Sequence, residues 1–215
     1  MRRIIIAFLA VCITLAATAQ QRAEDTAAGT ISGNQFQSAF FKFQYEFPKG
    51  WTYLDLDKMR AENVEASRRA AEKSLKEHGP DSTTVSGNTT TTRTTKLFGN
   101  SNLLIAGPAK IETSETNAVP RVRVWAHERV PGMLNDAGDH AKLIAKLGYK
   151  VVMPTTEIAA NGHKFVRIDV LHSDGQYHSF VETVCGEYIV GFDFYARTPE
   201  ELRALAETVN TVRFD

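Results

Sequence analysis

The chain has 215 residues, of which 43% are hydrophobic, and its 25 lysine and arginine residues balance 25 aspartate and glutamate residues. This length and composition predict one domain with a sizeable core, and the neutral balance excludes a strongly basic surface for nucleic acid. Only two cysteines are present, Cys12 and Cys185. Because Cys12 falls in the apolar leader described next, no internal disulfide is expected even though export would permit one.

The first 19 residues have the pattern of a secretory signal peptide. Arg2-Arg3 precede an apolar run at 4–17, and the small residues that follow predict cleavage after Ala19. A membrane anchor is the alternative, but the run is shorter than the roughly 20 apolar residues that a span requires. Lipidation of Cys12 is disfavoured because a bulky residue precedes it. We therefore expect an exported protein, periplasmic or secreted, with no membrane span after cleavage.

Residues 20–34 are small and polar without periodicity, which predicts a flexible leader between the cleavage site and the domain. Aromatic and polar residues then alternate from Phe36 to Phe47, which predicts a strand with one aromatic face. Pro48-Lys49-Gly50 ends that strand.

A long helix is predicted at residues 57–78, where oppositely charged pairs recur at helical spacing beside a thin apolar stripe. The alternative is a helix that binds a partner or lies on a membrane surface, but the apolar stripe is narrow and the positive and negative charges are balanced. Residues 79–96 are dominated by threonine and lack apolar periodicity. They are expected to form a long mobile loop.

Two further strands are predicted at 102–111 and 121–129, followed by a helix at 132–147 that Gly148 ends. The clearest helix signal follows residue 198, where Thr198-Pro199-Glu200-Glu201 forms a capping box with proline at the first helical position. The tail is expected to form a short strand or to pack onto the core.

Residues 155–196 predict a four-stranded antiparallel meander. Turn signals at Asn161-Gly162, Asp174-Gly175 and Gly186-Glu187 separate runs that alternate or are rich in β-branched residues. A two-residue turn sets the register of its hairpin, so residues that face each other can be read from the sequence.

This register predicts that Arg167 faces Glu182 and that Glu182 faces Gly191. One face of the meander is then apolar and is assigned to the core: Val166, Ile168, Val170, Val181, Val190, Phe192, Phe194 and Ala196. The opposite face mixes apolar with polar side chains, so it is expected to be only partly covered.

The half-polar face supplies the candidate residues for binding a ligand or partner. They are Arg167, Asp169, His178, Glu182, Gly191, Asp193 and Tyr195. Gly191 leaves a gap in the middle of a strand, where a ligand or a partner side chain would enter. Three carboxylates with one arginine and one histidine suit a cationic or hydroxyl-rich group. The alternative is that Arg167 and Glu182 form an ion pair that fixes the strand register, with the other charges solvated.

No catalytic residue, metal ligand or cofactor is predicted. The six histidines lack the spacings of a zinc site, and the chain contains no nucleophile elbow, P-loop or dinucleotide-binding run. Cys185 lies at a hairpin end beside the acidic Glu187, which disfavours a reactive thiolate. A small, partly buried residue at a strand end is the favoured interpretation of this cysteine.

The corner Phe47-Pro48-Lys49-Gly50-Trp51 and the run EYIVGFDFYARTPEELRALAETVNTVRF at 187–214 resemble the PsbP-like superfamily. The resemblance implies an α+β fold, an α/β/α sandwich with a central, mostly antiparallel sheet of six to seven strands and about three helices. It covers a single domain at 35–215, in which the helix and threonine-rich loop at 57–96 form an insertion. These motifs carry the fold, so no functional residue follows from them.

The family implies a binding or assembly module more often than an enzyme, which is an argument by analogy. We therefore expect an exported, non-enzymatic module of the cell envelope with an unidentified ligand or a partner protein in the envelope. The alternative is a small-molecule enzyme of hydrolase type that uses the polar face of the meander. The oligomeric state does not follow from the sequence.

Overall fold

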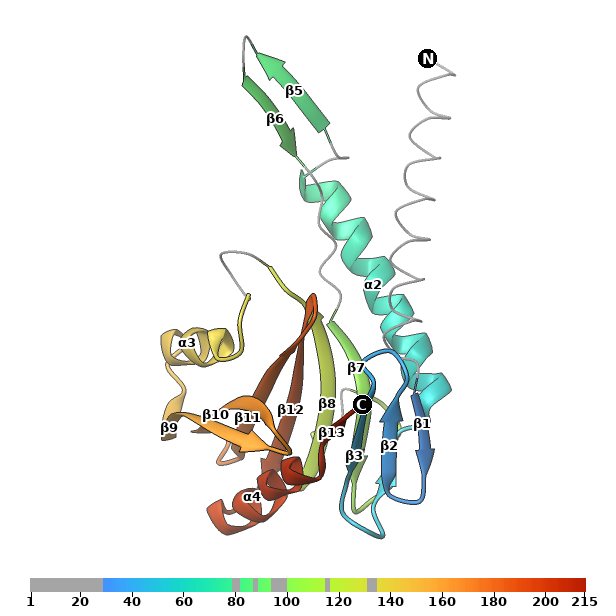
Figure 1. Cartoon of the computed structure of the whole chain (residues 1–215), viewed down its shortest axis with the longest axis vertical. Coiled ribbons are helices and arrows are strands. Elements are labelled where there is room, and N and C mark those ends of the chain that lie inside the picture. Colours follow the sequence, from blue (N-terminus) through green and yellow to red (C-terminus); the bar gives the residue numbers. More distant parts are fainter. Residues whose placement is uncertain (1–28, 79–81, 87–88, 94–99, 115–116, 131–134) are drawn as a thin grey trace.

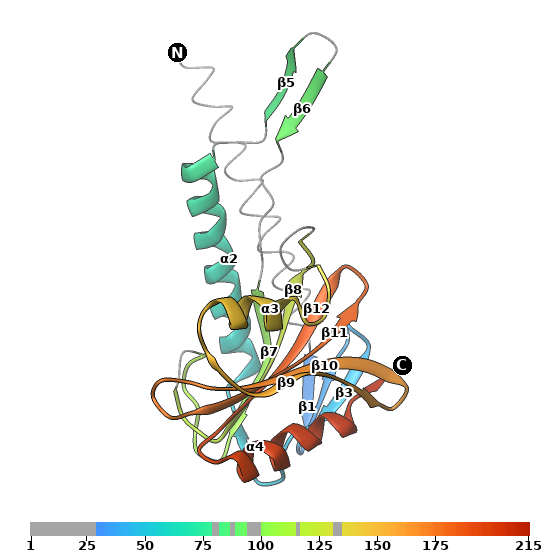
Figure 2. The same cartoon turned by 90° about the vertical axis from the view of Figure 1, so that its left-hand side faces the viewer.

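The computed structural model describes residues 29–78, 82–86, 89–93, 100–114, 117–130 and 135–215. The predicted signal peptide at 1–19 lies outside the described residues, as does most of the predicted leader. A seven-stranded antiparallel sheet lies between helix α3 (Asp139–Lys146) on one side and a four-stranded sheet on the other, as Figures 1 and 2 show. The predicted α+β sandwich is therefore confirmed, with three α-helices among the described residues.

The large sheet contains the predicted meander as four neighbouring strands. Its spatial order, antiparallel throughout, is β4 (Thr52–Tyr53), β7 (Asn100–Gly107), β8 (Arg121–Glu128), β12 (Tyr188–Ala196), β11 (Tyr177–Cys185), β10 (His163–Leu171) and β9 (Lys150–Ala160). The two strands predicted at 102–111 and 121–129 are β7 and β8. Strand β9 is the edge of the sheet, and it begins before residue 155.

A second sheet corrects two predictions about the start of the domain. Its order is β1 (Gly29–Ser32), β2 (Gln35–Ser38), β3 (Phe43–Glu46) and β13 (Arg213–Phe214). Strand β1 falls in the predicted leader, and the single strand predicted from Phe36 to Phe47 is the β2–β3 hairpin. The adjacent Phe40 and Phe41 break the alternation, and Lys42 has a φ of 53° that turns the chain. The predicted strand in the tail is confirmed as β13.

The main core lies between the two sheets and is largely aromatic. Phe36, Phe43 and Tyr45 are fully buried, and the rings of Phe43 and Tyr45 lie 5.8 and 5.4 Å from the ring of Phe192 on β12. Burying a side chain of this size contributes about 2–3 kcal/mol. The hydroxyl of Tyr45 keeps a partner, the Thr208 hydroxyl at 2.8 Å.

Helix α4 (Pro199–Ala206) closes the same core with the capping geometry that the sequence predicts. Thr198 has an extended backbone, and its Oγ1 accepts a hydrogen bond from the Glu201 N–H at 3.1 Å. Glu201 in turn accepts the Arg197 N–H at 2.8 Å. These bonds satisfy backbone donors that a helix start leaves unpaired.

Replacing Thr198 with alanine is expected to lower the free energy of unfolding by about 1 kcal/mol, because the cap is lost while the buried face of α4 is unchanged. Urea denaturation checks this, with Thr198→Ser as the control that retains the hydroxyl. An equal loss in both variants would show that the cap is not the cause.

The long predicted helix is confirmed as α2 (Leu56–His78), which packs against β7 by one end. The Asp55 carboxylate caps it by accepting the Lys58 N–H at 2.9 Å. Met59 is fully buried beside Ile105 of β7. The amide of Asn63 donates to the backbone carbonyl of Asn102 at 2.7 Å.

The threonine-rich segment corrects the expectation of a loop without regular structure. Strands β5 (Ser82–Ser86) and β6 (Thr89–Arg93) form an antiparallel hairpin, a two-stranded sheet of its own beyond the end of α2 (Figure 1). Threonine is β-branched and favours extended backbone, which explains pairing without an apolar pattern.

Helix α3 is shorter than the helix predicted at 132–147, part of which lies outside the described residues. Gly138 has a φ of 89°, so the backbone there is not helical. Asp139 follows, and its carboxylate accepts the N–H groups of Asn135 and Asp136 at 3.0 and 2.9 Å. Residues 135–138 therefore form a turn before the helix that hydrogen bonds to the Asp139 carboxylate hold in place.

One of the three predicted turns has a different length, and this changes the register of β10. The Asp174-Gly175 turn is a three-residue loop, closed by the His172 N–H donating to the Gln176 carbonyl at 2.9 Å, with Gly175 at a φ of 86°. Consequently Val166, and not Arg167, faces Glu182. The other two hairpins have two-residue turns, and Glu182 faces Gly191 as predicted.

Candidate functional site

The register of β10 divides the seven candidate residues between two faces of the large sheet. Arg167 pairs with Val181 and Asp169 with Ser179, so both lie on the face of the main core. The other five lie together on the face that α3 covers: His178, Glu182, Gly191, Asp193 and Tyr195.

Arg167 and Asp169 form a local ion pair on their own face. The guanidinium donates from Nε and Nη2 to the two carboxylate oxygens at 2.8 and 2.7 Å. A paired, two-point contact of this kind satisfies both charges. The predicted pair of Arg167 with Glu182 is therefore wrong, and these two residues are not part of the cluster on the α3 face.

The gap predicted at Gly191 is filled. Gly191 faces Trp125 of β8, and a Cβ built on this glycine would lie 2.2 Å from the indole atoms Cε2 and Cζ2. The absent side chain makes room for a buried tryptophan, so no ligand enters at this position.

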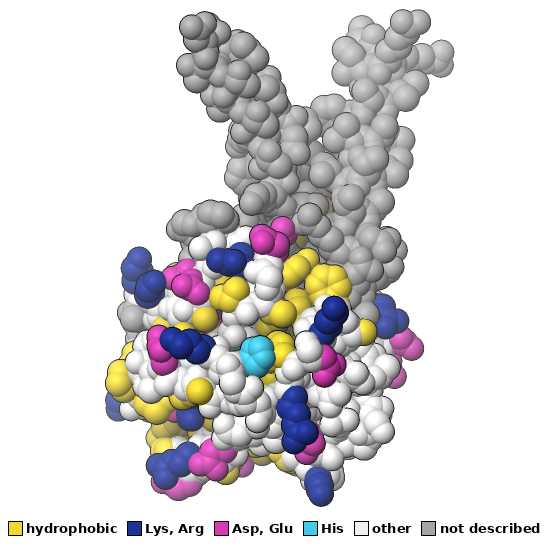
Figure 3. Space-filling model, in the orientation of Figure 1, with side chains coloured by type: hydrophobic (Ala, Val, Ile, Leu, Met, Phe, Trp, Pro, Cys, Tyr) yellow, Lys and Arg dark blue, Asp and Glu magenta, His cyan; other side chains and the backbone are white. Residues whose placement is uncertain are grey.

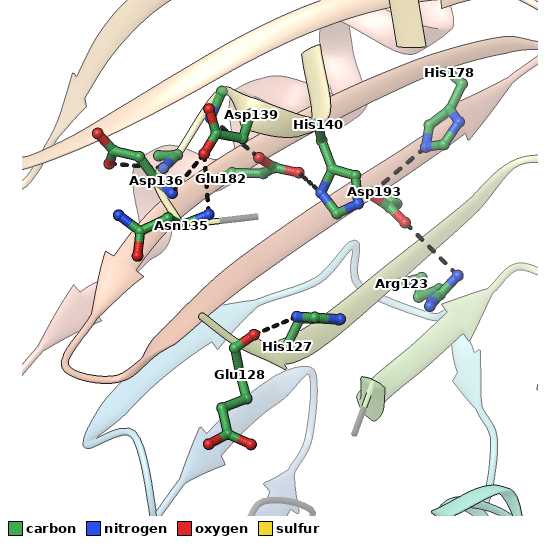
Figure 4. Close-up of polar contacts among 12 residues, drawn as sticks. Arg123, His127, Glu128, Asn135, Asp136, Asp139, His140, His178, Glu182 and Asp193 are labelled. Carbon is green, nitrogen blue, oxygen red and sulfur yellow. Dashed lines mark hydrogen bonds and ion pairs between the residues drawn. The ribbon is translucent and has the colours of Figure 1, made fainter. Parts of the chain in front are cut away.

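Asp193 lies at the centre of the buried cluster on the α3 face (Figure 4). His178 Nε2 lies 3.6 Å from Asp193 Oδ1, and Arg123 Nη1 lies 3.9 Å from Oδ2. Burial raises the pKa of this carboxyl, but the contact with His178, the nearby positive charge of Arg123 and the Trp125 side chain outweigh it and hold the pKa below its ordinary value. Asp193 is therefore a buried carboxylate.

His178 connects Asp193 to the surface. Burial lowers the pKa of His178, so the ring is neutral at pH 7. Its Nδ1 lies 3.1 Å from Nε2 of the partly exposed His172, which precedes the three-residue turn. The Tyr195 ring stacks on His178 at 4.0 Å, and the Arg121 guanidinium lies 4.2 Å from the centre of the Tyr195 ring.

Glu182 fixes the start of α3. Its Oε1 lies 2.6 Å from His140 Nδ1, and its Oε2 accepts the Gly138 N–H at 3.2 Å. The His140 ring meets the Trp125 ring edge to face at 5.2 Å. Burial lowers the pKa of His140, but the hydrogen bond and charge of Glu182 outweigh it, so the pKa is raised overall.

The raised pKa of His140 predicts a loss of stability as the pH rises. Stability from a protonated histidine is fully present below the unfolded pKa of about 6.5 and is lost as the pH rises through the folded pKa. Urea unfolding of the wild type between about pH 6 and pH 9 should show this loss relative to His140→Gln, which cannot titrate. A constant difference between the two proteins across that range would contradict the prediction.

The cluster also connects to α2. Arg123 donates from Nε to the Asn102 side-chain oxygen at 2.7 Å, and Asn63 of α2 bonds the backbone of Asn102 through both ends of its amide. Polar bonds thus run from α2 across the sheet towards α3, and they hold both helices to the same cluster.

A pocket of about 480 Å³ opens at the outer end of the cluster, beside His172. Residues 147–150, after α3, and residues 171–173, at the end of β10, line it. Exposed apolar side chains are concentrated in the stretch of chain that enters the pocket. Of the eight large hydrophobic residues that are exposed in the described structure, five fall between residues 143 and 152, and two of these, Leu147 and Tyr149, line the pocket.

Five residues of the cluster were missed in the sequence: Arg121, Arg123, Trp125, His140 and His172. Arg123 and Trp125 are two residues apart and so share a face of β8, but the neighbour of β8 in the sheet is β12, which is 60 residues away in the chain. Gly191 in the middle of a strand was the available signal, since it predicts close approach by a large neighbour.

The described part of the chain holds no cluster of three His, Cys, Asp or Glu side chains fit to bind a metal ion. None of its helices is long and apolar enough to cross a membrane. Cys185 lies on the other face of the sheet, and burial raises the pKa of its thiol. On the face in Figure 3, acidic and basic side chains are interspersed and form no region of one charge.

A scan of protein-family models gives no match to the chain, and a search of curated proteins gives none either. Among solved structures, the chain is similar to cyanobacterial PsbP (CyanoP) from Synechocystis sp., with 12% identity, a TM-score of 0.45, and coverage of 87% of this chain and 96% of that chain. It is also similar to a protein of unknown function from Pseudomonas aeruginosa, with 11% identity, a TM-score of 0.29, and coverage of 62% and 96%. The first match is to a protein that carries the name of the family the sequence resembles, and at these identities and TM-scores neither match carries a conclusion about family or role.

Proposed function

We propose that the protein is an exported, non-enzymatic binding module of the cell envelope that holds a small ligand in the pocket at 147–150 and 171–173. The observation that carries the proposal is that pocket itself, which combines apolar walls with polar groups and includes the exposed side chains of Leu147 and Tyr149. Ligand sites in proteins are concave and mostly apolar, with a few polar groups that orient the ligand.

Binding accounts for the chemistry of this site better than catalysis does. The buried carboxylates Asp193 and Glu182 are each engaged by neighbouring side chains, and both contribute to holding the fold. The sulfur of Cys185 lies on the opposite face, and its raised thiol pKa disfavours the thiolate that nucleophilic catalysis requires.

Export is proposed from the leader pattern at 1–19. The intact mass of protein purified from the native host tests it. A chain that begins at Gln20 supports export with cleavage, whereas a mass that includes the first 19 residues, or a lipid on Cys12, contradicts it.

A thermal-shift screen of small molecules tests binding at the pocket. Ser173 lines the pocket and is exposed, so Ser173→Trp should fill it and abolish every shift that depends on it. Thr156→Trp, on an exposed position of β9 outside the pocket, is the matched control and should keep those shifts. Shifts that persist equally in both variants would place binding elsewhere.

A further inference from the structure

The pocket has an apolar wall and two basic side chains. Leu147, Tyr149 and Leu171 supply the wall, while Lys150 and His172 supply nitrogen atoms. Lys150 faces Leu171 across β9 and β10, and it has no ion pair with any carboxylate in the described structure. An unpaired lysine beside an apolar wall favours a ligand that carries a negative charge on an apolar body.

The buried chain behind His172 fixes where its protons lie. His178 Nε2 and Asp193 Oδ1 are both buried, lie 3.6 Å apart, and make no hydrogen bond within the described structure, so each is the nearest polar contact of the other. A carboxylate only accepts, so Nε2 carries the proton of the neutral His178 ring and Nδ1 is left as an acceptor. His172 Nε2, 3.1 Å from that Nδ1, must then be the donor.

His172 Nδ1 is therefore the nitrogen that gains or loses a proton. When His172 is neutral, Nδ1 is an acceptor and repels the oxygens of an anion. When it is protonated, Nδ1 becomes a charged donor while Nε2 still donates to His178. The backbone of His172 is held in place, because its N–H and C=O both bond within the turn.

The groups that face His172 come from β9, from β11 and from the turn that follows it. Tyr149 of β9 meets its ring edge to face at 4.9 Å, Lys150 lies in the same pocket, and His178 of β11 is neutral behind it. Among the described residues the acid beside it is Asp174 in the following turn, whose Oδ1 accepts the Gln176 N–H at 3.1 Å. Burial lowers the pKa of His172, and the charge of Asp174 opposes this without outweighing it, so the ring of the free protein loses its proton more readily than an exposed histidine. Lys150 is the charged side chain that lines the pocket, and protonation of His172 on binding adds a second cation, so an anionic head group is favoured.

From this arrangement we infer that the pocket binds a small carboxylate with an apolar body, and that His172 takes up a proton from solvent at Nδ1 as the carboxylate binds. The head group contacts Lys150 and the protonated His172, and the apolar body lies on Leu147, Tyr149 and Leu171. The inference rests on the proposed function, because it names the ligand class of the same pocket.

Isothermal titration with three compounds of equal chain length tests the inference: octanoate, octanol and octylammonium. Octanoate should bind at least about tenfold more tightly than octanol, and octylammonium should bind least, because only the carboxylate satisfies both nitrogens. The affinity for octanoate should fall by about tenfold between pH 6 and pH 8. Titrations of octanoate repeated in buffers of different ionisation enthalpy should show a net uptake of protons on binding. Equal affinities for octanoate and octanol would overturn the inference.

Three variants test which side chain causes the preference for octanoate and its pH dependence. His172→Gln should lose the preference for octanoate together with its pH dependence, and Lys150→Gln should weaken octanoate binding severalfold while keeping the pH dependence. Lys146→Gln, an exposed lysine of α3 outside the pocket, should change neither. Retention of the preference in His172→Gln would also overturn the inference. If none of the three compounds binds, the carboxylate class is wrong, while binding at the pocket is decided separately by the Ser173→Trp screen.

Discussion

Replacing Gly191 with alanine is expected to lower the free energy of unfolding by about 3 kcal/mol, a large cost for one added methyl group. The new Cβ would lie 2.2 Å from two atoms of the Trp125 indole, and both residues are in the interior of the sheet. Neither strand can move away easily, because β8 and β12 are paired along eight residues. The indole must therefore leave its position beside His140.

A double-mutant cycle tests this cause by urea denaturation. Trp125→Leu removes the atoms in conflict, so the loss from Gly191→Ala should be much smaller in that background. If the losses of the two single variants simply add in the double variant, Gly191 is required for a reason other than the space that Trp125 occupies. Gly162→Ala is not a suitable control because its φ of 83° strains any side chain, whereas Gly191 has no such constraint.

The local parts of the fold were predictable from the sequence because their signals are local. The Asn161-Gly162 turn, the Thr198 cap and the α2 helix follow from residues a few positions apart, and each is present. The β2–β3 hairpin does not stand out in the sequence, because four aromatic residues on the two sides of the turn share one face and so resemble a single continuous strand. The β5–β6 hairpin was missed because polar threonines pair through the backbone alone.

The faces of β10 illustrate how little separates a correct prediction from a wrong one. Asp174-Gly175 marks the position of the turn in the sequence, but the loop contains three residues and not two. That single residue moves Arg167 and Asp169 to the core face and Val166 and Ile168 to the α3 face. Strands β11 and β12 have a two-residue turn, so the five candidates on them remain together.

The rest of the candidate site depends on contacts between distant parts of the chain. Trp125 reaches Gly191 only because β8 lies beside β12, and His140 reaches Glu182 only because α3 folds back over β11. No spacing in the sequence encodes either contact. The pocket arises in the same way, where the residues after α3 meet the end of β10.

Replacing Asp193 with alanine is expected to lower the free energy of unfolding by about 3–5 kcal/mol. The reason is that removal of the carboxylate leaves the charges and hydrogen-bond donors around it buried without a partner. Arg123, His178 and Trp125 all face this carboxylate. Glu157→Ala, which breaks the exposed pair with Lys164, is the matched control and should cost less than about 1 kcal/mol.

The Asp193→Asn variant separates the charge from the shape of the side chain. The lowered pKa of Asp193 means that its stabilisation is present above the unfolded value of about 3.9 and is lost as the pH falls through the folded pKa. The difference in unfolding free energy between wild type and Asp193→Asn should therefore shrink as the pH is lowered from 6 towards 3. A difference that stays constant over that range, or a loss in Asp193→Ala no larger than in Glu157→Ala, would mean that the buried carboxylate does not hold the cluster together.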